Sequence, residues 1–138
     1  MDQDPEMRRR VLEEHPSGRV VMLDTIAHVQ AQDAGHVVVC GSHGGISSAE
    51  YAARVPAAAV FLNDAGGGKD DAGRACLGFL EAKGIAAGTV SHDTAVIGDA
   101  LDTWESGVIS GVNERARIAG YVAGARLKDA VRAVLRER

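Results

Sequence analysis

The chain has 138 residues, which suits one domain with one hydrophobic core, and its 46% hydrophobic residues exclude a disordered chain. A formal net charge of −4, with no basic face outside the C-terminal helix, argues against a nucleic-acid partner. No long apolar span or secretory segment occurs, so we expect a cytoplasmic protein without a membrane partner, with Cys40 and Cys76 reduced and buried.

The first half of the chain alternates helical and strand patterns. In chain order we expect a short helix over residues 5–14, a turn at 16–18, a strand over 19–23, a short helix or irregular crossover over 26–32, a strand over 36–40, a helix over 46–55 and a strand over 57–62. Ser47 or Ser48 is expected to cap the third of these helical segments, and Pro56 to end it.

The second half continues the alternation. The clearest helix has one apolar stripe, made by Ala72, Ala75, Cys76, Phe79 and Leu80. Strands are expected over residues 85–90 and 108–112, followed by a short helix over 113–119 and a final helix with an apolar stripe over 127–135.

This alternation predicts a single α/β domain over residues 1–138. We expect three layers, α/β/α, around a mainly parallel five-stranded sheet of flavodoxin-like or Rossmann-like type. In such a sheet the carboxyl ends of all strands meet at one edge, where open α/β proteins bind their ligands. The loops that follow the strands are therefore the place to look for a site.

The loop 41–45, Gly-Ser-His-Gly-Gly, follows one buried-looking strand and leads into a helix. Free N–H groups at the start of a helix favour anions, so we expect Gly44 and Gly45 to bind an anionic group or developing negative charge. His43 is a candidate general acid or base, and Ser42 a candidate nucleophile or hydrogen-bond donor. A tight turn that needs glycine only for packing is the alternative.

The loop 63–71 follows the next strand and contains Gly66, Gly67 and Gly68 before Lys69. The three glycines are candidate anion-binding residues, and Lys69 is a candidate partner for an anionic substrate. The spacing is not that of a Walker A loop, which argues against nucleoside triphosphate hydrolysis. Asp64, at the strand end, is a further candidate catalytic residue, whereas a mobile polar loop is the alternative for the rest.

A third loop places His92 beside Asp93 after the strand over residues 85–90. A carboxylate stabilises a charged imidazole, so this pair is a candidate catalytic base and its tuning group. Asn113, after the last strand, is a candidate substrate-binding residue at the same edge. A divalent metal on the two histidines with Asp64 or Asp93 is left open but not favoured, because no metal-ligand spacing supports it, and the cofactor is unknown.

Two classes of function fit these loops. The first is a hydrolase or lyase that acts on a small polar or anionic molecule. The second is a non-catalytic anion- or phosphate-binding module, or a subunit of a larger enzyme. It includes a receiver-like signalling domain, which the chain resembles in its size and in the position of Asp64 at a strand end. The chain departs from receivers at two places: a single Asp24 stands where receivers carry an acidic pair, and Asn113 stands where they carry a lysine. Self-association through Trp104 or the helix from Leu127 is also left open.

Overall fold

The structure is a computed structural model that describes residues 9–138. Its centre is a six-stranded mixed sheet whose strands lie in the order in which they occur in the chain. The strands are β1 (Arg9–His15), β2 (Gly18–Leu23), β3 (Val37–His43), β4 (Ala59–Asn63), β5 (Ala87–Val90) and β6 (Ile109–Val112). The four central strands are parallel, and β1 and β6 join the two edges of the sheet antiparallel to them.

The first element is a strand, so the predicted helix over residues 5–14 is wrong from Arg9 onward, and residues 1–8 lie outside the described part. β1 pairs with β2 in a hairpin in which His15 is opposite Gly18, so Pro16 and Ser17 alone form the turn. Tertiary contacts favour the strand: Arg9 pairs with Asp33 in the connection between β2 and β3, and Glu13 pairs with Arg132 of the last helix.

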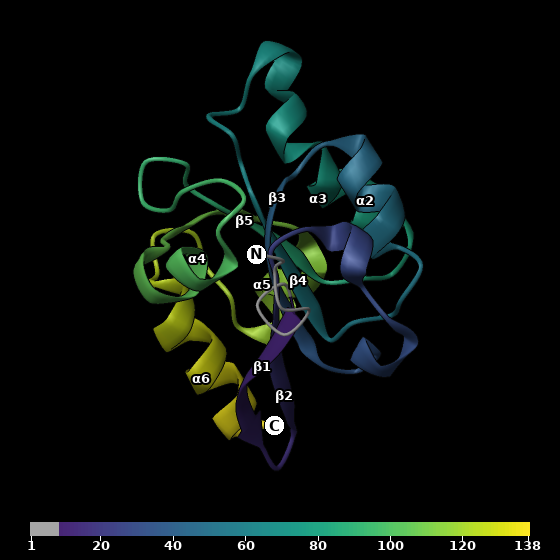
Figure 1. Ribbon diagram of the computed structural model, residues 1–138, viewed down its shortest axis with the longest axis vertical. Coiled ribbons are helices and arrows are strands. Elements are labelled where there is room, and N and C mark those ends of the chain that lie inside the picture. The colour runs from purple at the N-terminus through teal and green to yellow at the C-terminus, as the bar shows by residue number, and fades with distance from the viewer. Residues whose placement is uncertain (1–8) are drawn as a thin grey trace, which may run out of the picture.

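Helices cover both faces of the sheet, as Figure 1 shows. The α-helices are α2 (Ile46–Ala52), α3 (Ala75–Ala82), α4 (Ala100–Ser106), α5 (Glu114–Ala119) and α6 (Leu127–Glu137), and short 3₁₀-helices are η1 (Ile26–His28), η2 (Ala31–Asp33) and η3 (Lys69–Arg74). The helices α2 and α3 lie on one face, and α4 and α6 lie on the other (Figure 1). The three-layer α/β arrangement follows from these positions.

The strand order differs from the predicted flavodoxin-like or Rossmann-like type. In those folds the strand order reverses within the sheet, and ligands bind at the reversal. Here β2 to β5 are consecutive neighbours, so the right-handed crossovers through α2 and α3 all lie on one face. The same departure removes the flavodoxin-like topology that the receiver alternative requires.

The side chains of β3 explain why the strand buries both faces. Val37 and Val39 point into the core beneath α4 and α6, whereas Val38 and Cys40 point into the core beneath α2 and α3. Successive side chains of a strand alternate between faces, so the continuous apolar run fills both cores.

Trp104 of α4 is only 3% exposed in the core beneath α4 and α6, so it is not the contact surface that we considered for self-association.

The direction of β6 corrects one expectation about the site. Because β6 is antiparallel to β5, it ends near the start of β5, and Asn113 therefore lies at the opposite edge from Asp64 and His92.

No helix among residues 9–138 is both long and apolar enough to span a membrane.

Candidate functional site

Three loops follow β3, β4 and β5 at the carboxyl edge of the parallel strands. His43 ends β3, Asp64 follows β4 and His92 follows β5, and the loop after β4 stands out from the top of the view in Figure 1. The sheet thus brings these residues to one edge, with β4 between the two histidine-bearing strands. Within residues 9–138, hydrogen bonds and ion pairs join Asp64 to His92, but none joins His43 to either residue.

Asp64 is the organising residue of this edge, because its carboxylate is buried and fully engaged. One oxygen, Oδ1, accepts the backbone N–H groups of Gly66 at 2.8 Å and His92 at 3.1 Å. The other, Oδ2, accepts from the guanidinium of Arg74 at 3.1 Å. The side chain is only 2% exposed, so these donors replace the water that a carboxylate otherwise requires.

The surroundings keep this carboxyl group ionised. Burial by itself raises the pKa of Asp64, but the N–H of Gly66, the hydroxyl of Ser110, the N–H of His92 and the charge of Arg74 together outweigh it. The net effect holds the pKa below its usual value of 3.8. A buried carboxylate that stays charged at neutral pH can orient and stabilise a positively charged neighbour.

His92 is the side chain that lies beside this carboxylate. Its Nδ1 lies 3.5 Å from Oδ1 of Asp64, and its Nε2 lies 3.2 Å from Oδ1 of Asp93. The imidazole is 49% exposed and the Asp93 side chain 81% exposed, so Nε2 is held only by a group that solvent or a ligand can displace. The imidazole is therefore anchored at one nitrogen and accessible at the other.

Arg74 belongs to the same cluster, although the sequence analysis did not identify it. Its guanidinium bridges Asp64 and Asp71, at 3.1 and 2.6 Å, and the side chain is 34% exposed. The two carboxylates raise the pKa of Arg74, first through the hydrogen bond that Arg74 donates to Asp71. An arginine in a polar loop gives no sequence signal of its own, because only the folded loop brings it back to the strand end.

The loop after β4 wraps around Asp64, and two of its three glycines direct their N–H groups to this residue. Gly66 donates its N–H to the carboxylate of Asp64, and Gly67 donates its N–H to the backbone carbonyl of Asp64. Positive φ angles occur at Gly66, Gly67 and Gly68, and also at three residues with side chains: Ala65 (52°), Asp70 (55°) and Asp71 (59°). Left-handed backbone costs a non-glycine residue roughly 1–2 kcal/mol, so the loop is strained.

A close backbone contact fixes this loop to the strand. A Cβ atom added at Gly73 would lie 1.8 Å from the carbonyl oxygen of Asp64, and the N–H of Gly73 donates to the carbonyl of Gly67 at 2.7 Å. Only glycine permits this approach. The predicted helix over this region therefore begins later, as α3 at Ala75, and the segment before it is the 3₁₀-helix η3.

The loop after β3 is closed by internal hydrogen bonds. The N–H of Gly44 donates to the carbonyl of Asn63 at 2.7 Å, and the N–H of Gly45 donates to Nδ1 of His43 at 3.0 Å. The hydroxyl of Ser42 accepts the N–H of Ile26 at 3.0 Å. These groups satisfy one another within the fold, which matches the packing alternative for this turn, while the imidazole of His43 remains exposed.

The remaining candidates lie apart from the Asp64–His92 contact. Lys69 is exposed in the loop after β4 and makes no ion pair within residues 9–138. Asn113 caps α5 at the opposite edge: its side-chain oxygen accepts the N–H groups of Ala87 and Ala116, and its amide donates to the carbonyls of Leu77 and Ile85. Those four bonds use the side chain fully.

Neither a metal nor a reactive thiol stands out in the described part of the chain. Among residues 9–138, no three His, Cys, Asp or Glu side chains are grouped to hold a metal ion. Burial raises the pKa of the Cys40 thiol to about 11 and that of Cys76 to about 12. Thiols of this kind are poor nucleophiles, because the reactive species is the thiolate.

No protein-family model matches the chain, and comparisons with curated proteins and with solved structures find no significant match.

Proposed function

We propose that the chain is an enzyme in which His92 acts as a general acid and base on a small polar or anionic molecule, in a hydrolase or lyase reaction. The observation that carries the proposal is the 3.5 Å approach of a buried, ionised carboxylate, Asp64, to Nδ1 of a half-exposed imidazole. Geometry of this kind supports proton transfer at the other ring nitrogen.

In the proposed reaction, Nε2 of His92 takes a proton from a water molecule or from the substrate. The substrate first displaces the exposed carboxylate of Asp93, which lies 3.2 Å from Nε2. Asp64 then stabilises the positive charge that develops on the imidazole, without itself taking up the proton. Return of the proton from Nε2 to a leaving group completes a hydrolytic or elimination step.

One cation that contacts Asp64, and a second cation in the same loop, support an anionic substrate. Arg74 keeps 34% of its side chain exposed while it bridges Asp64 and Asp71, and Lys69 is exposed in the same loop. We assign Lys69, which has no carboxylate partner within residues 9–138, to an anionic part of the substrate. Ser42 is not needed in this mechanism, because its hydroxyl is bonded within the fold. His43 is not needed either, because no hydrogen bond or ion pair within residues 9–138 joins it to Asp64 or His92.

A turnover screen tests the proposal. Purified wild-type protein and His92→Gln are incubated with a mixture of small esters, amides, lactones and hydroxy acids, and consumption is followed by mass spectrometry and NMR. We expect wild type to consume at least one compound and His92→Gln to consume it at least about 100-fold more slowly. His28→Gln is the matched control, because the side chain of His28 makes no hydrogen bond or ion pair within the described residues.

Equal consumption by wild type and His92→Gln would remove His92 from the chemistry. Binding of a compound without turnover would instead favour the non-catalytic binding module.

A further inference from the structure

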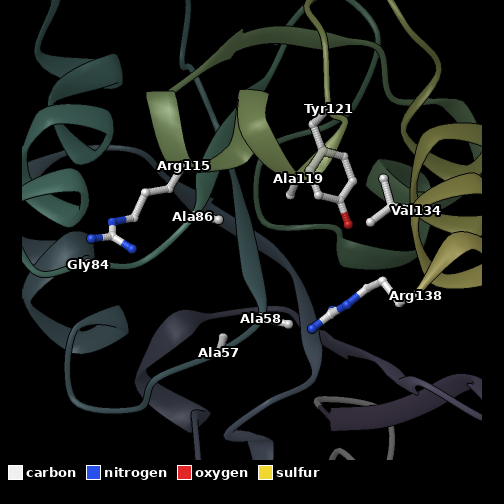
Figure 2. Close-up of a pocket in the computed structure, with 9 residues that line it drawn as sticks. All are labelled: Ala57, Ala58, Gly84, Ala86, Arg115, Ala119, Tyr121, Val134 and Arg138. Atoms are coloured by element: carbon white, nitrogen blue, oxygen red, sulfur yellow. The ribbon is translucent and has the colours of Figure 1, made fainter.

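A pocket lies at the opposite edge of the sheet from Asp64 and His92. It has a volume of about 290 Å³ and is lined by the residues before β4 and β5, by α5 and by the end of α6. Small side chains, including Ala58 and Ala86, form its floor between Arg115 and Arg138, as Figure 2 shows. The pocket shares no residue with the Asp64–His92 cluster.

Tyr121 supplies the most informative group in this pocket. The side chain is only 1% exposed, and its ring packs edge-on against Phe61 with the ring centroids 5.0 Å apart. Its hydroxyl is buried and has no hydrogen-bond partner among residues 9–138. In Figure 2 this hydroxyl points toward the side of the pocket formed by Val134 and Arg138. A buried hydroxyl without a partner destabilises a fold, so the group needs an acceptor that the described residues do not supply.

Two guanidinium groups line this pocket from different elements: that of Arg115 lies beside Gly84, and that of Arg138 lies on the side of Tyr121, as Figure 2 shows. Arg115 comes from α5 and Arg138 follows α6, and the two side chains enter from different sides of the pocket (Figure 2). Arg115 is only loosely paired, with its Nε 3.8 Å from the nearest oxygen of Glu81. Arg138 forms no ion pair with any carboxylate side chain within residues 9–138, whereas Arg117 and Arg132 are each paired with a glutamate.

All three polar groups are hydrogen-bond donors, and two carry a positive charge. From this donor set we infer that the pocket binds a small dianion of an oxyacid, either a phosphate or a short dicarboxylate. One end of the anion lies against Arg115 and the other against Arg138, and an oxygen accepts from the hydroxyl of Tyr121. Because Arg138 is exposed, its side chain can shift to admit the anion to the hydroxyl.

Isothermal titration calorimetry at low ionic strength tests this inference, with inorganic phosphate and succinate as probes. Acetate, and sodium chloride at matched ionic strength, serve as comparisons for nonspecific salt effects. We expect one of the two dianions to bind with one-to-one stoichiometry and acetate to bind at least about 10-fold more weakly. The two probes distinguish a phosphate ligand from a dicarboxylate ligand.

Substitutions locate the binding. Arg115→Gln and Arg138→Gln should each weaken binding about 10-fold or more. Arg136→Gln should leave binding unchanged, because Arg136 is an exposed arginine in the last turn of α6 that does not line the pocket. Tyr121→Phe keeps the ring against Phe61 and should weaken binding about 5-fold. Without ligand, the same variant should be as stable as wild type or more stable, because it removes an unpaired hydroxyl.

The inference is overturned if neither phosphate nor succinate binds, or if Arg115→Gln and Arg138→Gln bind them as wild type does. Neither readout depends on enzymatic turnover, so the outcome is independent of the role proposed for His92.

Discussion

The carboxylate of Asp64 lies 3.5 Å from Nδ1 of His92 and also accepts the backbone N–H of that residue at 3.1 Å. Both the position of the loop after β5 and the orientation of its imidazole thus depend on one buried carboxylate from the neighbouring strand. The same contact links the stability of this edge to the chemistry that we propose for it.

Acid should weaken the fold through Asp64. The pKa of this carboxyl group is lower in the folded chain than its ordinary value of 3.8, so its contribution to stability is complete above about pH 4 and is lost as the pH falls through the folded-state pKa. Asp64→Asn should lower the free energy of unfolding by about 1–3 kcal/mol at pH 7 and reduce its loss toward pH 2. Urea unfolding across this pH range measures both effects.

Asp93→Asn is the matched control for that series, because Asp93 is 81% exposed beside the same imidazole. Its unfolding free energy should stay within about 0.5 kcal/mol of wild type. If the two variants behave alike, the buried carboxylate has no special role in stability.

The contact between Gly73 and Asp64 predicts a severe steric effect. Gly73→Ala would place a Cβ atom 1.8 Å from a backbone oxygen, so the loop around Asp64 must shift and the free energy of unfolding should fall by about 3 kcal/mol or more. Gly78→Ala, in α3 with open space around the added atom, should instead stabilise by about 0.5–1 kcal/mol. Thermal unfolding of both variants compares them, and a tolerated Gly73→Ala contradicts the described packing.

Asn113 should act as a structural residue. Asn113→Ala removes four hydrogen bonds and leaves buried backbone groups of Ala87, Ala116 and Ile85 unpaired, at a cost of about 2–4 kcal/mol. Asn113→Asp should be comparably damaging, because a carboxylate oxygen then faces the carbonyl of Ile85. Chemical denaturation measures the stability of both variants. If Asn113→Ala kept wild-type stability but lost ligand binding, the role in substrate binding that the sequence suggested would be restored.

The two thiols should be unreactive in the folded chain. The pKa of Cys40 is raised from 9.0 to about 11, which lowers the thiolate fraction about 100-fold near neutral pH, and that of Cys76 is raised further. Ellman's reagent at pH 8 should therefore label neither cysteine quickly until guanidinium unfolds the protein, when both react. Rapid labelling of the native protein at either position would place that thiol at the surface.

The hydrophobic pattern predicted most of the central sheet, because strands buried on both faces read as continuous apolar runs. It did not predict β1 or the direction of β6. The strand Arg9–His15 is stabilised by contacts with Asp33 and Arg132, which are remote in the chain, and its own charges resemble those of a helix surface. The helix Ala100–Ser106, which Asp99 caps, was missed because it is short and has no clear apolar stripe.

The candidate site could be predicted from the sequence only where its residues lie at the ends of predicted strands. Residues at strand ends, such as Asp64 and His92, follow directly from a parallel sheet. Arg74 returns to the strand end only through a loop in which Asp70 and Asp71 adopt left-handed backbone, and local patterns do not encode that geometry. Asn113 was misplaced solely because the direction of its strand was wrong.

The most direct test of the account is a double-mutant comparison of turnover, with a substrate from the screen. His92→Gln and Asp64→Asn should each lower kcat, His92→Gln by about 10²–10⁴-fold, and the double variant should be little worse than His92→Gln alone, because the carboxylate acts through the imidazole. His43→Gln should retain wild-type turnover. Losses that multiply in the double variant, or an active His92→Gln, would contradict a coupled Asp64–His92 pair.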